Sequence, residues 1–370
     1  MPLEEGLKDI ELRKRDHIRI SLERDVSFRN KTSWFEYVEL IHSAAPELDF
    51  SGISTKVRFL SREFSAPFLV EGMTGGTGEA EKINGNIAEA AAEFGIPAGV
   101  GSQRAAVKNP KLVRTFKIAR DRAPDAFLIA NIGAVQLVED GIEMALKAID
   151  MIEADAIAIH LNPLQEVIQP DGGAFFKGFY RMVRRLKEEV GIPVIVKEVG
   201  CGISGPVSAA LAENGVDAID VAGSGGTNWT LIEKIRAEHS GAEDKVSLAE
   251  VFIDWGIPTA AAVLESRAFT DTPIIASGGI RTGLEAAKAL ALGCDMVGFA
   301  HPILVEAVKN PEAVLGKLRQ LRMELVTAMF LTSCGDVDTL RHTEFILLGP
   351  LLDWARQRCV NHPKLRRKQL

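Results

Sequence analysis

The sequence predicts an α/β protein: a single (β/α)8 TIM barrel with an N-terminal extension and C-terminal helices. Three observations lead to this prediction. The first two are that short apolar runs recur eight times along the chain and that an amphipathic stretch follows each of them. The third is their spacing. Most repeats span roughly 30 residues, the length expected when a barrel of about 250 residues is divided by eight.

Each predicted strand is short and almost continuously apolar, as parallel strands buried on both faces must be. The eight runs are residues 68–70, 96–100, 127–132, 155–160, 193–199, 217–222, 273–277 and 295–300. A doubly wound open sheet is the competing fold. No GxGxxG pattern follows the first run, so the eight repeats favour the closed barrel.

Helical patterns fill the segments between the strands. Residues 79–94 and 136–151 place Ala, Ile and Leu at helical spacing. Glycines directly before later strands predict helix ends; they are Gly95, Gly191, Gly215 and Gly293. The long segment 223–272 has room for an additional helical insertion.

Two segments lie outside the predicted barrel. Residues 1–60 form the N-terminal extension, residues 61–310 the barrel, and residues 311–370 a C-terminal helical extension that begins with a helix over 311–331. A basic cluster ends the chain and is predicted to be a solvated tail; it consists of Lys364, Arg366, Arg367 and Lys368.

Composition excludes several classes of protein. The 370 residues carry a net charge of -7, which argues against a broad nucleic-acid-binding surface. The four cysteines are scattered, with no spacing typical of a metal site or a disulfide framework. The charged first residues lack the apolar core of a signal peptide, and no run reaches the ~20 apolar residues of a membrane span. We therefore expect a cytoplasmic protein with free thiols, no membrane partner and no nucleic-acid partner.

Glycine-rich segments follow several strands, at the end of the barrel where active sites of this fold lie. Residues 71–78 contain four glycines, and residues 223–226 contain three. Residues 277–281 read Ser-Gly-Gly-Ile-Arg after the seventh strand. Loops seven and eight often build a phosphate site in such barrels, so Gly279, Ile280 and Arg281 are predicted to hold a phosphate.

The segment after the fourth strand is the most informative. Period-two alternation places His160 on the same face as the small residues Ala156 and Ala158, pointing inward at the barrel mouth. Gln165 and Glu166 follow in the same loop. A carboxylate such as Glu166 suits Mg²⁺ when substrate phosphates complete the coordination shell.

Two cations belong to the same mouth. Lys197 ends an otherwise apolar strand, where a buried ammonium needs an anion or an electron-rich ligand, and we favour a ligand contact over a structural salt bridge. Arg104 follows the second strand and is suited to a bidentate phosphate contact. Asn131, at the end of the third strand, is a weaker candidate.

From residue 13 to about residue 348, the chain resembles the type 2 isopentenyl-diphosphate isomerases, which are FMN-dependent barrels. The glycine loops are shared by many FMN barrels. The segment 160–166 and the leading Arg-Lys pair are more specific to this family. The resemblance rests on residues 13–17, 73–76, 102–104, 160–166, 197–200, 225–229 and 278–281.

The resemblance implies a role for each matching residue. FMN would contact Met73, Thr74, Gly75, Ser102, Asn131, Lys197 and Thr227, with Gly279, Ile280, Arg281, Ala300 and His301 around its phosphate. Substrate would contact Arg13, Lys14, Ser102, Gln103, Arg104 and Gln165, and Glu166 would hold Mg²⁺. Ala222 departs from the family, which often has a hydroxyl residue there, so one hydrogen bond to the flavin is in doubt.

The implied reaction converts isopentenyl diphosphate to dimethylallyl diphosphate with FMN that NADPH keeps reduced. Gln165 and His160 are the predicted catalytic residues, orienting the substrate beside the flavin. Family members usually assemble as tetramers or larger, so a tetramer or an octamer is expected. The alternative is an FMN-dependent oxidoreductase of the 2-hydroxy-acid oxidase type, but such enzymes use a His after the sixth strand, and residues 223–227 contain none.

Overall fold

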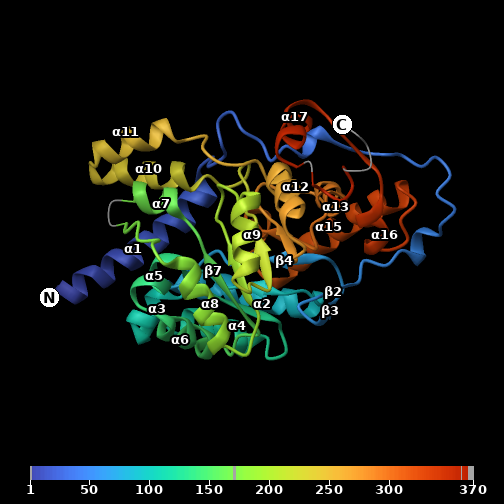
Figure 1. The fold of residues 1–370 in the computed structure, drawn as a ribbon. Helices are drawn as coiled ribbons and strands as arrows, with labels where there is room; N and C mark the ends of the chain where they lie inside the picture. Colours follow the sequence, from blue (N-terminus) through green and yellow to red (C-terminus); the bar gives the residue numbers. More distant parts are fainter. Residues whose placement is uncertain (1, 170–171, 360, 366–370) are drawn as a thin grey trace.

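Eight parallel strands close into a barrel at the centre of the molecule (Figure 1), which confirms the predicted fold class. The computed structural model describes residues 2–169, 172–359 and 361–365. In spatial order the barrel is β10-β11-β4-β5-β6-β7-β8-β9. The strands are β4 Phe68–Val70, β5 Ala98–Gly99, β6 Leu128–Gly133, β7 Ala156–His160, β8 Val194–Lys197, β9 Ala218–Asp220, β10 Ile274–Ala276 and β11 Met296–Phe299. Seven of them fall within a predicted apolar run, and β6 extends one residue beyond its run, to Gly133.

Side-chain size separates the two faces of the strands. Ala156 and Ala158 of β7 lie in the cluster that fills the barrel, whereas Ile157 and Ile159 pack with the surrounding helices. The surrounding helices are α2 Gly78–Phe94, α3 Arg104–Lys108, α4 Arg114–Arg122, α5 Ala134–Glu139, α6 Ile142–Ile152, α7 Pro163–Ile168, α8 Phe179–Glu189, α9 Gly205–Glu213, α12 Thr259–Phe269, α13 Gly283–Leu292 and α14 His301–Ala307. The alternation of small and large residues therefore directs His160 inward.

Two local predictions need correction. The single helix expected over 136–151 is two helices, α5 and α6, because Gly141 adopts a φ of 77° between them. Gly95, Gly215 and Gly293 take positive φ after helices as predicted. Gly191 does not, since α8 ends at Glu189 in extended backbone.

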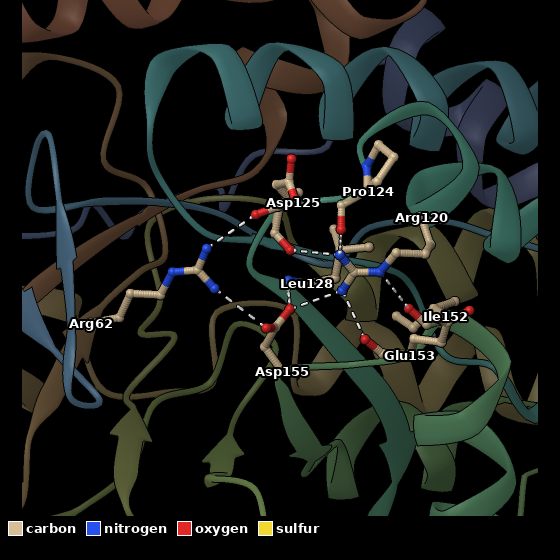
Figure 2. Close-up of polar contacts among 9 residues, drawn as sticks. Arg62, Arg120, Pro124, Asp125, Leu128, Ile152, Glu153 and Asp155 are labelled. Carbon is tan, nitrogen blue, oxygen red and sulfur yellow. Dashed lines mark hydrogen bonds and ion pairs between the residues drawn. The ribbon is translucent and has the colours of Figure 1, made fainter.

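The hairpin of β2 Val57–Phe59 and β3 Arg62–Phe64 lies beside the amino ends of β6 and β7, where Arg62 donates to Asp155 and to the Asp125 carbonyl. Beside it, Arg120 of α4 ties several loops together (Figure 2). Its guanidinium donates to the carbonyls of Pro124, Ala126, Ile152 and Glu153 at 2.6–3.1 Å and to Asp155 Oδ2 at 2.9 Å. Asp155 in turn accepts the Leu128 backbone N–H, so one arginine aligns the starts of β6 and β7.

Replacing Arg120 with alanine is expected to lower the free energy of unfolding by about 3 kcal/mol, because four carbonyls and one carboxylate lose their donor. Urea denaturation followed by circular dichroism measures this change. Arg62→Ala is the matched control: Arg62 contacts the same Asp155, but 46% of its side chain is exposed, so its loss should cost less than about 1 kcal/mol. Equal losses from the two variants would contradict this prediction.

The N-terminal extension consists of one long helix followed by several short elements. α1 Pro2–Glu23 crosses the barrel mouth, where Ile20 packs with Val26 and Ile232. Beside it lies the predicted insertion, α10 Trp229–Ser240 and α11 Glu243–Val251 (Figure 1). The rest of the extension contains the short helices η1 Phe35–Tyr37 and η2 Phe50–Gly52 and strand β1 Val38–Leu40.

The C-terminal segment begins with α15 Pro311–Leu331, at the predicted bounds, and continues with α16 Val337–His342 and α17 Gly349–Arg358. Between these last two helices lies β12 Phe345–Leu347, which the sequence analysis missed and which pairs antiparallel with β1. Lys364 is not part of a solvated tail: its ammonium donates to the carbonyls of Ala291 and Thr343. Arg366, Arg367 and Lys368 lie outside the described residues. In the described part of the chain, no helix is both long and apolar enough to cross a membrane.

Candidate active site

A cavity of about 210 Å³ lies at the carboxyl ends of the barrel strands. Segments after all eight strands contribute to its wall, and α1 covers it from outside. Most predicted site residues line it: Arg13, Lys14, Met73, Thr74, Ser102, Arg104, Asn131, His160, Gln165, Glu166, Lys197, Thr227, Gly279, Ile280, Arg281, Ala300 and His301. The cavity thus brings together segments from both ends of the chain.

Two predicted residues do not line it. Gln103 is fully buried, where its amide donates to the Ala148 carbonyl at 2.8 Å and accepts the Asn131 N–H at 2.9 Å. Gly75 packs against Phe116 instead: a Cβ on Gly75 would lie 1.9 Å from that ring. Both residues shape the loops behind the cavity, and in this structure neither reaches it.

Interlocked glycines from two loops form one side of the cavity. Gly225 takes a φ of 117°, Gly278 of 97° and Gly279 of 78°, a region that glycine enters with little cost. A Cβ on Gly226 would lie 2.4 Å from the Gly279 nitrogen. The two backbones pack too closely to admit side chains, so they can present N–H groups to an anion.

Cations from α1 and from the β5 loop meet at the opposite side. Burial, together with the charges of Arg13 and Arg104, lowers the pKa of Lys14 to about 8. The Nε of Arg104 is buried and has no hydrogen-bond partner among the described residues. Mutual repulsion of the three cations and the unused Nε donor of Arg104 suit this cluster to an anion.

His160 is held in one orientation by Asn131, whose Oδ1 lies 2.8 Å from His160 Nδ1. Burial, followed by the charges of Lys197 and Lys14, lowers the pKa of His160 to about 3. The imidazole is therefore neutral, and its Nδ1–H donates to Asn131. It can bind and orient a ligand but does not carry a charge at neutral pH.

Glu166 lies buried at the rim of the cavity. Its Oε1 accepts from Asn162 Nδ2 at 3.0 Å and its Oε2 from the Gly173 N–H at 3.1 Å. No group of three His, Cys, Asp or Glu side chains that could hold a metal occurs among the described residues. A cation at Glu166 would need ligand oxygens from elsewhere, as predicted for a substrate diphosphate.

Glu233 of α10 connects three elements around the cavity, a role that the sequence analysis missed. Fully buried, it accepts from His17 of α1 at 2.9 Å, from Gln165 of α7 at 2.9 Å and from Arg236 at 2.6 Å. Burial opposes its ionisation, but these partners outweigh burial and lower its pKa. An acidic residue within an insertion helix carries no local signal of such a contact.

Lys197 lines the cavity. It also forms structural salt bridges, which were the less favoured of the two roles predicted for it. Its Nζ lies 3.5 Å from Glu71 Oε2 and 3.4 Å from Asp220 Oδ2. Ala222 nearby takes a φ of 37°, an uncommon conformation for a residue with a side chain. Ala222 lines the cavity. It has no hydroxyl, so it cannot form the hydrogen bond to the flavin that the sequence analysis placed in doubt.

Comparison with known proteins gives two kinds of similarity. The chain is 46% identical to an isopentenyl-diphosphate delta-isomerase of Ignicoccus hospitalis, across 96% of this chain and 98% of that protein. It is 45% identical to proteins of the same name from Halobacterium salinarum, across 94% and 96% of the two chains, and from Nostoc sp., across 90% and 94%.

Residues 177–346 match the family described as FMN-dependent dehydrogenase. Among solved structures, a mandelate oxidase mutant with a monooxide FMN adduct superposes with a TM-score of 0.63 at 17% identity, across 94% of this chain and all of that one. Mandelate oxidase itself gives 0.60 at 17% identity, across 92% and 98%. At this identity the similarity shows the fold alone.

Proposed function

Since this chain belongs to the isopentenyl-diphosphate delta-isomerase family, we propose that it interconverts isopentenyl diphosphate and dimethylallyl diphosphate with bound FMN and Mg²⁺. The observation that carries this proposal is the cavity. On one side it has a glycine cradle, formed by Gly225, Gly226, Gly278 and Gly279, and on the other a cationic cluster of Arg13, Lys14 and Arg104. One phosphate-bearing cofactor and one diphosphate substrate account for both features.

The residues present fit FMN. The glycine cradle has the N–H groups that its phosphate would need, and Thr74 Oγ1 is buried in the cavity wall without a partner among the described residues. Gly279, Ile280, Arg281 and Ala300 would surround the phosphate. His301 would lie beside the phosphate without donating to it from Nε2, because its Nε2 already donates to the Ser21 carbonyl at 3.0 Å.

The remaining cofactor contacts would come from the strand ends. They are Met73, Thr74, Ser102, Asn131, Lys197 and Thr227, all in the cavity wall. When bound and kept reduced by NADPH, the flavin would supply the acid and base of the proton transfers. The chain's own residues hold and orient the reactants, which suits a site with few free side-chain acids.

The diphosphate would lie against Arg13, Lys14 and Arg104, with Ser102 beside them. Glu166 would hold Mg²⁺ against the same group, leaving the diphosphate to supply further ligands. Gln165 is positioned for the apolar part of the substrate by its hydrogen bond to Glu233. His160, neutral and fixed by Asn131, would contact the diphosphate.

The assignment of Gln165 and His160 as catalytic residues is tested by Gln165→Ala and His160→Ala, assayed beside flavin analogues of altered basicity. We expect each variant to lose activity and the analogues to change the rate. Full turnover in both variants, with a rate independent of the flavin, would remove the assignment.

An oxidoreductase of the 2-hydroxy-acid oxidase type would have the fold of mandelate oxidase, but this protein lacks the histidine base that such an enzyme is expected to have after β9. The β9 loop contains Gly223, Ser224, Gly225, Gly226 and Thr227, and none of them can accept a proton as a His would. The deciding experiment incubates the protein with isopentenyl diphosphate, Mg²⁺, FMN and NADPH, beside a tube without reductant. Dimethylallyl diphosphate in the complete mixture alone supports the isomerase; its absence there returns the choice to the oxidoreductase.

Activity should fall on the alkaline side because Lys14 loses its charge with a pKa of about 8. A basic group binds the diphosphate only while protonated, so kcat/KM, which reports the free enzyme, should decrease by about tenfold per pH unit above that pKa. In Lys14→Arg the cation persists, and the decrease should move to higher pH. An identical alkaline limb in both proteins would contradict the role of Lys14.

We also propose that residues 1–60 act as the substrate-clamping extension, residues 61–310 as the FMN-binding barrel and residues 311–370 as a helical extension. Assembly as a tetramer or octamer and a cytoplasmic location stay predictions. Size-exclusion chromatography with light scattering tests the assembly.

A further inference from the structure

A small second cavity of about 20 Å³ lies inside the barrel beneath the candidate active site. Its polar wall consists of Glu71, Asn131, Lys197 and Asp220, and apolar strand residues form the rest. Glu71, Asn131 and Lys197 also line the large cavity, so they separate the two spaces. The volume is enough for one water molecule, and the wall offers it several hydrogen-bonding groups.

Two carboxyl groups share one ammonium in this wall. Lys197 Nζ lies 3.5 Å from Glu71 and 3.4 Å from Asp220, and it donates to the Glu198 carbonyl at 2.7 Å. All three side chains are almost completely shielded from solvent. If both carboxyls were ionised, the group would hold an unbalanced buried negative charge, which is costly. One proton shared by the pair removes that charge.

The hydrogen bonds distinguish the two carboxyls. Asp220 Oδ1 accepts from Ser277 Oγ at 2.6 Å and from the Ala222 N–H at 3.2 Å, so two donors point at this carboxyl oxygen. Glu71 Oε1 is buried and has no partner among the described residues. A Cβ on Gly298 of β11 would lie only 2.1 Å from this oxygen, so the absence of a side chain at Gly298 leaves the space that the Glu71 carboxyl occupies. Lys197 is therefore the one cation beside the Glu71 carboxyl among the described residues, and it approaches the other oxygen, Oε2.

We propose that Glu71 carries a proton and Asp220 the negative charge, with Glu71 sharing its proton with Asp220 and a water molecule in the small cavity. Glu71 is then a positioning residue for Lys197: it holds the ammonium at the floor of the site without neutralising it. Lys197 keeps one ionised partner, and the paired charges balance. An electron-rich or anionic ring in the large cavity would therefore meet a cation whose place is fixed. The link to a flavin rests on the proposed function; the protonation pattern does not.

The surrounding groups agree with this assignment. Burial, together with the Asp220 carboxylate, raises the pKa of Glu71 to about 8, although Lys197 acts in the opposite direction. Burial lowers the pKa of Lys197, but its acidic neighbours, Asp220 first among them, outweigh burial and bring the value to about 12. The other polar groups that face the cavity or its carboxyls are Asn131 from β6 and Ser277 after β10, and neither titrates in this range. Glu198, which follows Lys197, does titrate there, because burial raises its pKa to about 7. Glu198 is the same in the wild type and in Glu71→Gln, so only the difference between these two proteins reports Glu71. His160 at the end of β7 is neutral.

The test measures stability against pH in the protein without cofactor or substrate. An ordinary glutamate has a pKa of 4.5, so between pH 4.5 and about pH 8 the folded protein holds a proton on Glu71 that the unfolded chain has released. The stabilisation is complete below that window and is lost as the pH rises through it. We expect the thermal unfolding midpoint of the wild type to decrease between pH 4.5 and about pH 8 when it is compared with that of Glu71→Gln at each pH, because glutamine cannot titrate.

Glu63→Gln is the matched control, because Glu63 also pairs with a lysine but is exposed, and it should follow the wild type at every pH. Infrared difference spectra of wild type and Glu71→Gln should show one protonated carboxyl band at neutral pH. A stability difference that does not change with pH, or the absence of that band, would overturn the proposal. So would failure of Glu71→Gln to fold, because an amide is the closest mimic of the protonated acid.

A second measurement uses the protein with FMN. Glu71→Gln should bind FMN within about threefold of the wild type, since the amide preserves the neutral partner. Asp220→Asn removes the ionised one and should weaken binding at least tenfold. Equal losses would overturn the proposed asymmetry. If the wild type does not isomerise isopentenyl diphosphate, the proposed function fails, while the pH and infrared results still decide the state of Glu71.

Discussion

Removing residues 1–17 should lower kcat/KM for isopentenyl diphosphate by at least about a thousandfold while the protein still binds FMN. The deletion takes away Arg13, Lys14 and His17, which reach the cavity from outside the barrel. Losing a buried charged partner costs about 2–5 kcal/mol, and 1.4 kcal/mol corresponds to a factor of ten. The deletion would also open the site to water.

FMN should remain bound because the glycine cradle lies within the barrel and because Ser21, which holds His301, stays in the chain. The measurements are steady-state turnover and the flavin absorbance of the purified protein. Arg13→Ala combined with Lys14→Ala tests the same cations with α1 intact. Arg15→Ala combined with Arg19→Ala removes two exposed charges from the same helix and should keep full activity. A truncated protein that isomerises at the full rate would contradict the role of α1.

Gly279→Ala should weaken FMN binding at least a hundredfold with the fold retained. The φ of 78° at this residue is unfavourable for alanine. The added Cβ would lie 2.5 Å from the Gly225 carbonyl oxygen, so the two glycine loops must separate. Donors that approach the phosphate from both loops would then lose their alignment, and a factor of a hundred corresponds to about 2.7 kcal/mol.

Titrating the cofactor-free protein with FMN and following flavin fluorescence measures the effect. Gly316→Ala is the control, because Gly316 lies within α15, and a Cβ there would meet nothing within 4 Å. This substitution should leave FMN binding unchanged and should stabilise the helix slightly. Unaltered affinity in Gly279→Ala would show that the phosphate does not depend on these loops.

Much of the site could be predicted from the sequence because a barrel imposes a simple geometry. Residues directly after parallel strands meet at one end, so Asn131, His160 and Lys197 had to converge once the eight runs were recognised. The same rule fails within a loop. Gln103 follows β5 as Ser102 and Arg104 do, yet its side chain turns back into the helix layer to satisfy buried backbone groups. Local spacing does not decide between these two directions.

The sequence by itself determined the closed barrel, the inward face of the strand that ends at His160 and the glycine-rich loops, since all three follow from local periodicity and backbone preference. Only the tertiary structure decided which distant groups complete the site. His17 and Glu233, 216 residues apart, bond across the mouth. Lys197 of β8 meets Asp220 from the neighbouring strand β9 and Glu71 from the end of β4, which lies across the barrel. These contacts depend on how separate elements pack, because a buried charge takes whichever partner the fold brings within reach.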